Sequence, residues 1–377
     1  MQLSVIILNF NVRYFLEQCV LSVQKALEGI EGEIIIVDNN SSDDSCAMMH
    51  ERFPQIKLLQ NKENVGFPKG NNIGVAQAKG EYICILNPDT VVAEDTFTKV
   101  LAFAKTKANL GIVGCKLIDG TGNFLPESKR GIPTPWVAFT KIFGLYKVFP
   151  KNKWFNQYYA QHISENETGK VEILVGAFMV MQRNLYNEIG GFDENCFMYS
   201  DDIDLSYMVL KKGKSNYYLH ETTVIHYKGE STIRDGKYMK RFQEAMNFFY
   251  KKHFNKSVIF DIFMKMGSVV FLFFKKQQQK NSTRVIDKYV FFTKEKTNLN
   301  LSKPLDYYAD FNSFYDSSTV NYEIIFDAKS FKNKEIIGFM STFKSKNITF
   351  KNYIDGTNFL VGSNNANDIG QIIICEN

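Results

Sequence analysis

The chain has 377 residues, more than a single hydrophobic core usually covers, so we expect more than one domain. Its formal net charge of +5 is small for this length and does not by itself indicate a nucleic-acid partner. Its six cysteines show no CxxC spacing, which disfavours a zinc site or a disulfide framework and is typical of a reducing compartment such as the cytoplasm.

Strands and helices alternate over the first part of the chain. The apolar run at residues 3–8 predicts a strand, and it lacks the basic start and the cleavage site of a signal peptide. Further strands are predicted at residues 33–37, 56–60, 81–86 and 111–117, with helices at 16–27, 42–48 and 68–79. This alternation predicts an α/β fold, a mostly parallel twisted sheet flanked by helices and Rossmann-like, which binds ligands beyond the carboxyl ends of its strands.

The middle of the chain is less regular. Residues 119–170 are rich in proline and aromatic side chains, and we expect a loop-and-helix segment that covers a site. Order returns with a strand at 171–175, a helix that starts near Asp201, a strand at 222–225 and a closing helix at 237–253.

Residues 256–280 form a basic connecting segment. Its apolar part, 257–274, is interrupted by Asp261 and Lys265 and is too short between charges to span a bilayer. It is either a buried helix that joins two domains or an interfacial helix attracted to an anionic membrane surface by its flanking lysines. After it we expect a small α/β appendix, with strands at 322–326 and 348–353, a helix at 330–343 and a turn at 359–365. The expected domains are therefore 1–255, 256–280 and 281–377.

Two polar motifs follow early strands. Asp38 ends a strand, where its carboxylate can accept the ring N–H of uracil or thymine; the alternative is a turn or helix-cap aspartate. Residues 64–74 are dense in glycine and asparagine, and Gly66 and Gly70 would let the backbone approach a ligand. The helix that follows would offer its N-terminus to phosphate, although a simple glycine-rich turn fits the same residues.

Three further motifs carry acids or histidine. Asp89, in an Asn-Pro-Asp turn, and His226, at a strand end, are candidate ligands of Mg²⁺ or Mn²⁺, and each also fits a purely structural role. Asp201, Asp202 and Asp204 crowd three carboxylates into four residues, which can raise the pKa of one of them toward that of a general base. The alternative is a set of acids favoured by a helix N-terminus.

The order and spacing of these motifs closely resemble the family 2 glycosyltransferases of the GT-A fold, especially the rhamnosyltransferase-like branch. The resemblance covers about residues 2 to 250. It is carried by Val5-Ile-Ile-Leu-Asn-Phe-Asn11, Val37-Asp-Asn-Asn-Ser-Ser42, Asn64-Val-Gly-Phe-Pro-Lys-Gly-Asn-Asn72, Leu86-Asn-Pro-Asp89, Gly176-Ala-Phe-Met179, Gly190-Gly-Phe-Asp-Glu194, Asp201-Asp-Ile-Asp204 and His226 with Gly229 and Ser231.

The resemblance implies roles for individual residues. Asp202 would be the catalytic base, Asp201 would position it or the acceptor, and Asp89 and His226 would hold a divalent cation, Mg²⁺ or Mn²⁺. Asn87 stands where the family often has an acid, which leaves strict dependence on the cation open. The donor would be bound by Asn9, Asn11, Asp38, Asn40, Gly66, Phe67, Gly70, Asn71, Asn72 and Asn87.

The implied function is inverting transfer of a sugar from a nucleotide-diphosphate donor, a UDP- or dTDP-sugar with dTDP-rhamnose among them, to a hydroxyl of a glycan or lipid-linked acceptor. It would serve cell-surface polysaccharide synthesis, in the cytoplasm or peripherally on the inner face of the cell membrane, with no nucleic-acid partner. A nucleotidyltransferase or a dinucleotide dehydrogenase would need a glycine-rich loop where residues 9–15 stand. The remaining alternative is a non-catalytic nucleotide-sugar-binding or scaffold protein, which would not need all three acids.

Overall fold

The computed structural model describes residues 1–227, 236–254, 285–295, 299–315, 319–354, 356–364 and 370–375, and of residues 236–243 the backbone alone. The basic connecting segment 256–280, with its apolar stretch, lies outside the described residues. Among the helices that are described, none is both long enough and apolar enough to cross a membrane.

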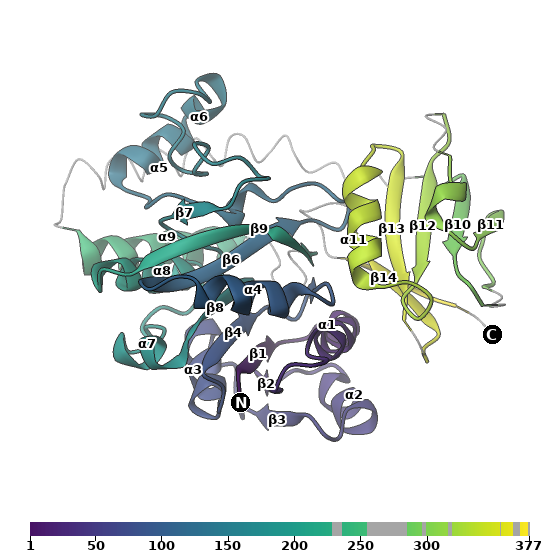
Figure 1. The fold of residues 1–377 in the computed structure, drawn as a ribbon, viewed down its shortest axis with the longest axis horizontal. Coiled ribbons are helices and arrows are strands. Elements are labelled where there is room, and N and C mark those ends of the chain that lie inside the picture. The colour runs from purple at the N-terminus through teal and green to yellow at the C-terminus, as the bar shows by residue number, and fades with distance from the viewer. Residues whose placement is uncertain are drawn as a thin grey trace.

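The first sheet has nine strands in the order β3-β2-β1-β4-β8-β6-β9-β5, with β7 paired to β9 (Figure 1). The strands β1, β2, β3 and β4 pair in parallel, as do β6 and β9, whereas β8 runs antiparallel between β4 and β6. The expected mostly parallel α/β sheet is confirmed. The strands are β1 (Leu3–Asn9), β2 (Gly32–Asp38), β3 (Lys57–Gln60), β4 (Tyr82–Leu86), β5 (Thr90–Val91), β6 (Leu110–Ile118), β7 (Gly169–Val171), β8 (Phe178–Gln182) and β9 (Ser215–His226).

Helices cover both faces of this sheet because its central strands are apolar on both sides. Along β1, Val5 and Ile7 join one core cluster, and Ile6 and Leu8 join another on the opposite face. The helices are α1 (Arg13–Ala26), α2 (Ser45–Arg52), α3 (Phe67–Ala76), α4 (Thr96–Lys105), α5 (Pro135–Ile142), α6 (Leu145–Val148), α7 (Arg183–Glu188), α8 (Asp201–Lys211) and α9 (Gly236–His253), with a 3₁₀ turn at Pro126–Ser128.

A second sheet follows, in the order β11-β10-β12-β13-β14-β15. Its first four strands are parallel, and β14 and β15 are antiparallel additions. The turn expected at 359–365 is wrong for its first residues: Phe359, Leu360 and Val361 are buried in β14 and pair with β15. The elements are β10 (Lys288–Phe292), β11 (Leu305–Tyr308), β12 (Tyr322–Asp327), α11 (Asn333–Thr342), β13 (Ile348–Tyr353), β14 (Phe359–Gly362) and β15 (Gln371–Ile374), with a 3₁₀ turn at Phe311–Ser313.

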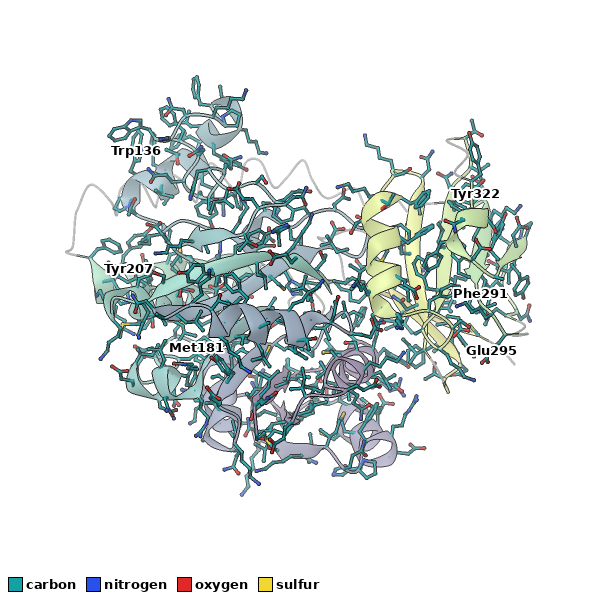
Figure 2. The ribbon with its side chains drawn as sticks, in the orientation of Figure 1. Trp136, Met181, Tyr207, Phe291, Glu295 and Tyr322 are labelled. Atoms are coloured by element: carbon teal, nitrogen blue, oxygen red, sulfur yellow. The ribbon has the colours of Figure 1, made fainter. Side chains whose placement is uncertain are left out.

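The second sheet packs against the first through an apolar core shared by both. One cluster contains Phe15 and Tyr227 from the first unit and Met340 and Phe359 from the second. Polar contacts reinforce it, since the amide of Asn352 donates to the hydroxyl of Tyr227 at 3.0 Å. Figure 1 shows α11 on the side of the second sheet that faces the first. Figure 2 shows side chains filling the space between the two units. The boundaries at residues 255 and 280 stay a prediction.

Candidate active site

A cavity of about 440 Å³ opens beyond the carboxyl ends of β1, β2 and β4. This is the edge at which a mostly parallel sheet is expected to bind ligands. Five of the predicted site residues line it, namely Gly66, Phe67, Asn87, Asp201 and Asp202. The other lining residues are Leu8, Phe10, Asn39, Asn64, Pro88, Arg130, Val175, Gly176, Ala177, Phe197, Met198 and Tyr199.

Asp202, in the first turn of α8, has one carboxylate oxygen held in place and the other open. Its Oδ2 accepts hydrogen bonds from Nη2 of Arg130 at 2.5 Å and from the backbone N–H of Gly176 at 3.1 Å. Both charged side chains are nearly buried, with 13% and 11% of their surfaces exposed. Among the described residues, no hydrogen-bond donor contacts Oδ1. The carboxylate is therefore oriented while one oxygen remains available to a ligand.

Asp201 has the same chemistry and a different environment. Burial, and then the negative charge of Asp202, raise the pKa of the Asp201 carboxyl above its ordinary value. Tyr199, two residues earlier, has a φ of 78°, in the left-handed region that a tyrosine rarely adopts. The chain thus turns sharply into α8 and places one acid that favours its proton beside one that forms an ion pair.

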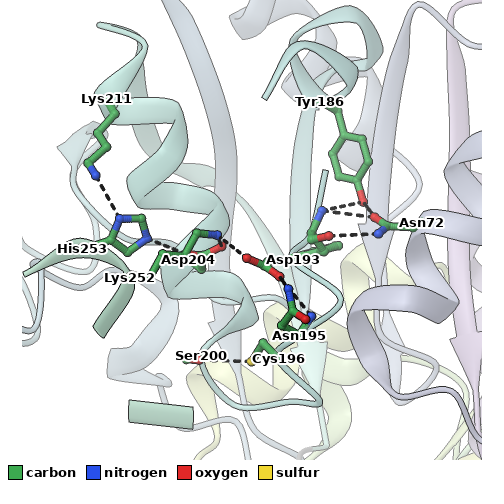
Figure 3. A network of polar contacts seen from close by, with 11 residues as sticks. Asn72, Tyr186, Asp193, Asn195, Cys196, Ser200, Asp204, Lys211, Lys252 and His253 are labelled. Carbon is green, nitrogen blue, oxygen red and sulfur yellow. Dashed lines mark hydrogen bonds and ion pairs between the residues drawn. The ribbon is translucent and has the colours of Figure 1, made fainter. Parts of the chain in front are cut away.

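The third acid of this cluster points elsewhere. Asp204 is 2% exposed and accepts from Nζ of Lys252 at 2.8 Å and from Nε2 of His253 at 2.5 Å, both on α9. Lys252 also contacts Asp193 at 2.7 Å, so the network joins α8, α9 and the turn before α8 (Figure 3). Asp204 is not among the residues that line the cavity.

The predicted nucleoside-binding residues form one cluster at the ends of β1 and β2. Oδ1 of Asp38 accepts from Nδ2 of Asn9 at 2.8 Å and from the hydroxyl of Ser41 at 2.6 Å. Asn11 accepts from the backbone N–H of Ser42 at 2.7 Å. Asn11 and Asn40 have positive φ values of 56° and 63°, which asparagine tolerates better than most residues. The structure brings these four predicted residues together, outside the lining of the cavity.

The two glycines of the predicted phosphate loop are required by packing. Gly66 has a φ of 84°, and a Cβ there would lie 2.9 Å from the ring of Phe197. A Cβ on Gly70 would lie 2.4 Å from Cδ1 of Leu8 on β1. The first glycine brings the N-terminus of α3 to the cavity, and the second seats the helix on the sheet.

Asn71 and Asn72 use their amides within the fold. Asn71 is fully buried and donates to the carbonyl of Phe67 at 2.9 Å. Asn72 accepts from the hydroxyl of Tyr186 at 2.5 Å and donates to the carbonyl of Phe192 at 2.9 Å (Figure 3). Neither lines the cavity: Asn71 bonds within α3, and Asn72 holds α3 against the turn at residues 190–194.

The predicted metal ligands are neighbours at the edge between β5 and β9. Nε2 of His226 lies 3.4 Å from Oδ1 of Asp89 and 3.3 Å from the side-chain amide of Asn87. Asp89 and His226 are 4% and 7% exposed. Oδ1 of Asn87 and Nδ1 of His226 are buried and have no hydrogen-bond partner in the described part of the chain. Oxygen and imidazole nitrogen are suitable ligands for Mn²⁺, so these residues fit a cation.

The cation would need ligands besides these two side chains. No group of three or more histidine, cysteine, aspartate or glutamate side chains is arranged around one point among the described residues. The side-chain amide of Asn87 lies 3.3 Å from Nε2 of His226, and its oxygen would be a third protein ligand once the amide is turned toward the cation. Oxygens of a bound diphosphate would complete the coordination.

Arg130 is the residue of this site that the sequence did not reveal. It lies in the segment 119–170 and also donates to the carbonyl of Leu174 at 3.2 Å. Although burial opposes its charge, the carboxylate of Asp202 raises the pKa of Arg130. The only signal in the sequence was a basic pair, Lys129 and Arg130, in a stretch that was expected to cover a site.

The chain is similar to known glycosyltransferases. Residues 4–190 match the family model "Glycosyl transferase family 2". The chain is 26% identical over 244 residues to the N-acetylglucosaminyl-diphospho-decaprenol L-rhamnosyltransferase of Mycobacterium tuberculosis, with 62% of this chain and 78% of that protein covered. It is 32% identical over 175 residues to the GalNAc(5)-diNAcBac-PP-undecaprenol beta-1,3-glucosyltransferase of Campylobacter jejuni, with 41% and 55% covered.

Solved structures are more distant. A mannosyltransferase from Pyrobaculum calidifontis in complex with GDP-Man and Mn²⁺ has a TM-score of 0.47 and 17% identity, with 72% of this chain and 70% of that chain covered. These likenesses are too loose to carry a conclusion about ligands. The family match and the named relatives suffice: the chain belongs to glycosyltransferase family 2, and the protein is a glycosyltransferase.

Proposed function

We propose that the protein is an inverting glycosyltransferase that uses a UDP- or dTDP-sugar, with dTDP-rhamnose the first donor to test, and a hydroxyl of a glycan or lipid-linked acceptor. The observation that carries the proposal is the carboxylate of Asp202 in the cavity, with one oxygen held and the other open. The rhamnosyltransferase of M. tuberculosis and the glucosyltransferase of C. jejuni, both named for a lipid-linked substrate, support the choice of donor and acceptor.

In the proposed reaction, Asp202 removes the proton of the acceptor hydroxyl through its open Oδ1. The acceptor oxygen then forms a bond to the anomeric carbon while the bond from that carbon to the diphosphate breaks, and the nucleoside diphosphate leaves. A single displacement inverts the configuration. Arg130 and the N–H of Gly176 keep the carboxylate of Asp202 oriented. Asp201, whose pKa is raised, would in its protonated form donate a hydrogen bond that positions the acceptor or the base.

The donor would lie along the predicted residues. The cluster of Asn9, Asn11, Asp38 and Asn40 would bind the nucleoside. Gly66 and Phe67, at the start of α3, would bring backbone N–H groups to the diphosphate. Gly70, Asn71 and Asn72 would act by holding α3 in place, since their contacts lie within the fold.

Asp89, His226 and the amide oxygen of Asn87 would hold Mg²⁺ or Mn²⁺. When bound, the cation would neutralise charge on the leaving diphosphate. The close approach of Nε2 of His226 to Oδ1 of Asp89, at 3.4 Å in a buried position, supports this assignment. The variants Asp89→Ala and His226→Ala should weaken binding of the donor diphosphate more with Mn²⁺ than with a chelator. Equal losses in both conditions would speak against a shared cation.

The proposed location is the cytoplasm, with peripheral attachment to the inner face of the cell membrane. It is supported by the lipid-linked substrates in the names of two relatives. In this proposal residues 1–255 form the catalytic domain, 256–280 connect, and 281–377 form an additional unit. Recovery of the native protein in the membrane fraction of lysed cells, and its release by high salt, would test the attachment.

The variant Asp202→Asn tests the function directly. It keeps the shape of the side chain and removes the base, so turnover should fall about 10²- to 10⁴-fold while donor binding changes little. A variant that keeps more than a tenth of the turnover would contradict the assignment of the base. A wild-type chain that binds nucleotide sugars and neither transfers nor hydrolyses them would instead be the non-catalytic binding protein.

A further inference from the structure

Helices α5 and α6 carry an exposed apolar face. Figure 1 shows them set apart from the sheet, and Figure 2 shows Trp136 on the outer side of this projection. Five of the twelve exposed large apolar side chains of the described residues lie in this short segment, and they include both tryptophans of the chain. We call these five residues the α5–α6 face: Trp136 (43% exposed), Phe143 (40%), Val148 (67%), Phe149 (48%) and Trp154 (70%).

Members of the α5–α6 face contact one another and neighbouring aromatic residues of the same segment. The indole N–H of Trp136 donates to the backbone carbonyl of Trp154 at 2.8 Å. The ring of Trp136 stacks on that of Phe139, with 5.6 Å between the ring centroids. Phe149 packs on Phe155 at 5.3 Å. None of these rings belongs to the hydrophobic core clusters of the described residues. Exposed apolar patches of this kind mark surfaces that bind a partner.

The segment is also uniformly basic. The sequence has no aspartate or glutamate between Glu127 and Glu165. Lys147, Lys151 and Lys153 are exposed beside the apolar residues. Lys129 and Arg130 point inward instead, to the carbonyl of Ala160 and to Asp202 respectively. The exposed positive charge therefore has no acid nearby along the chain and complements an anionic surface.

The same segment leads to the catalytic carboxylate. A second cavity, of about 590 Å³, is lined by Lys153, Asn156 and Gln157 of this segment and by Arg130. Arg130 lines the first cavity as well and holds Asp202. Arg130 therefore borders both the cavity that Asp202 lines and the cavity that residues next to the α5–α6 face line.

We propose that the α5–α6 face docks onto the surface of an anionic lipid bilayer. Tryptophans prefer the interface, aliphatic and phenyl side chains enter the acyl boundary, and lysines are attracted to anionic headgroups. A single-stranded nucleic acid would also meet aromatic and basic residues, but it binds in basic grooves by stacking on rings. Here the face projects outward, and its second most exposed member is Val148, which offers no ring. The inference deepens the proposal of a lipid-linked acceptor, and its test uses neither donor nor acceptor.

The two tryptophans report on this face alone, because the chain has no others. The full-length protein is mixed with vesicles of phosphatidylcholine and phosphatidylglycerol in a 3:1 ratio, or of phosphatidylcholine alone, with and without brominated acyl chains. With the anionic vesicles, the tryptophan emission should shift to shorter wavelength and be quenched by the brominated lipid. Flotation of the same mixtures in a density gradient shows whether the protein binds the vesicles. Flotation of the protein without quenching of the tryptophan emission would place the contact on another segment, such as 257–274, and overturn the proposal. So would a failure to float.

Matched variants test the face independently of the probe. The triple variant Val148→Ser, Phe149→Ser, Trp154→Ser should float at least about tenfold less well than the wild type. The control Val285→Ser, Tyr315→Ser, Ile374→Ser removes side chains of similar exposure (68%, 87% and 53%) from the second unit and should float like the wild type. Equal losses in the two triples would show a general effect of apolar surface and overturn the proposal.

Charge and competing partners complete the test. Lys147→Gln with Lys151→Gln should lower binding to the anionic vesicles about tenfold and leave the weak binding to neutral vesicles unchanged. Thermal unfolding of each variant within a few degrees of the wild type confirms that the fold is kept. If a labelled single-stranded oligonucleotide binds more tightly than the vesicles and loses its binding in the same variants, the face is a nucleic-acid site and the proposal fails.

Discussion

At the scale of single residues, the neighbouring side chains Asp201 and Asp202 differ in how readily they ionise, because their surroundings differ. Asp202 forms an ion pair with Arg130, whereas burial and the charge of Asp202 raise the pKa of Asp201. Two adjacent, buried carboxylates seldom both ionise freely. This difference fits the proposed roles, in which Asp202 acts as the base and Asp201 holds a proton.

The first prediction concerns Arg130. In Arg130→Gln, Asp202 loses its charged partner, so the turnover should fall about 10- to 100-fold while the KM for the donor stays within about twofold. Arg130→Lys should recover part of the turnover, because a charge returns without the planar guanidinium.

A stability measurement serves as control for this prediction. Removing one partner of a nearly buried pair costs about 3 to 5 kcal/mol of the free energy of unfolding. Adding Asp202→Asn to Arg130→Gln should restore part of that loss, because the unpaired charge is gone. If the double variant is no more stable than Arg130→Gln, the two side chains are not coupled.

The second prediction is a pH dependence caused by Asp201. Its pKa in the folded chain lies above the unfolded value of about 3.9, so folding favours its protonated form. As the pH rises from the unfolded value through the raised folded value, the folded state loses this advantage and its stability falls.

Asp201→Asn is neutral at every pH and avoids that loss. Its Tm should therefore exceed the wild-type Tm by an amount that increases between pH 4.5 and pH 8. Differential scanning calorimetry across this range gives the comparison. A Tm difference that stays constant with pH would mean that Asp201 does not titrate in this window.

At the scale of elements, α8 has one face that lines the cavity and another that packs against α9. Asp202 faces the cavity, while Asp204, two residues later on the helix, turns to α9 and contacts Lys252 and His253 (Figure 3). The helical turn of about 100° per residue directs these neighbours to different sides. The acidic cluster in the sequence is therefore two clusters in space.

The third prediction follows from that network. Asp204→Ala leaves His253 without its buried acceptor and Lys252 with Asp193 alone, so the free energy of unfolding should fall by about 1 to 3 kcal/mol. Donor binding should remain, because Asp204 does not line the cavity. Urea unfolding and a donor titration separate the two effects. Loss of donor binding in a chain that is still folded would place Asp204 in the active site.

At the scale of the whole molecule, the second unit is fixed to the first by a shared core. Backbone N–H groups of Asn333 and Lys334, where α11 begins, donate to the carboxylate of Glu94 at 2.7 and 3.0 Å. Asn352 donates to Tyr227, which directly follows the proposed metal ligand His226. The second unit therefore supports the wall of the proposed metal site, and damage to the shared core should reach that site.

The fourth prediction uses two glycines with nearly equal backbone conformations. Gly122 has a φ of 81°, and a Cβ there would lie 2.1 Å from the carbonyl oxygen of Met340 on α11. Gly29 has a φ of 79° and no atom within 4 Å of that position. Alanine costs about 1 to 2 kcal/mol in this region at either site.

Gly122→Ala should therefore reduce the free energy of unfolding by about 1 to 3 kcal/mol more than Gly29→Ala does. The extra loss measures the fit between the two units. Equal values for the two variants in urea titrations would show that the second unit moves aside at little cost, and that the shared core is not close-packed.

Local patterns in the sequence predicted β1, β2, β3, β4 and β6, the helix that starts near Asp201 and the acids at strand ends, whereas β5 and the central strand β8 were not predicted. Apolar spacing and turn residues act over a few positions, so no distant partner is needed to read them. The end of β2 at Asp38 and the start of α8 at Asp201 both follow such signals. The strand β14 was misread because its three apolar residues stand beside a run of glycine, serine and asparagine typical of turns.

Only the tertiary structure decided which of these polar residues share a site. Arg130 and Asp202 are 72 positions apart, and no periodicity relates them. Asn71 and Asn72 fit a donor-binding loop by sequence, yet their side-chain amides form hydrogen bonds within the fold. Asp204 is adjacent to Asp201 and Asp202 in the sequence, but its carboxylate bonds to His253 on α9. The exposure of the α5–α6 face was equally unreadable, because an aromatic segment is apolar in sequence whether it is buried or not. Burial and ion pairing depend on chain segments that meet only after folding, and these contacts set the charge and direction of each side chain.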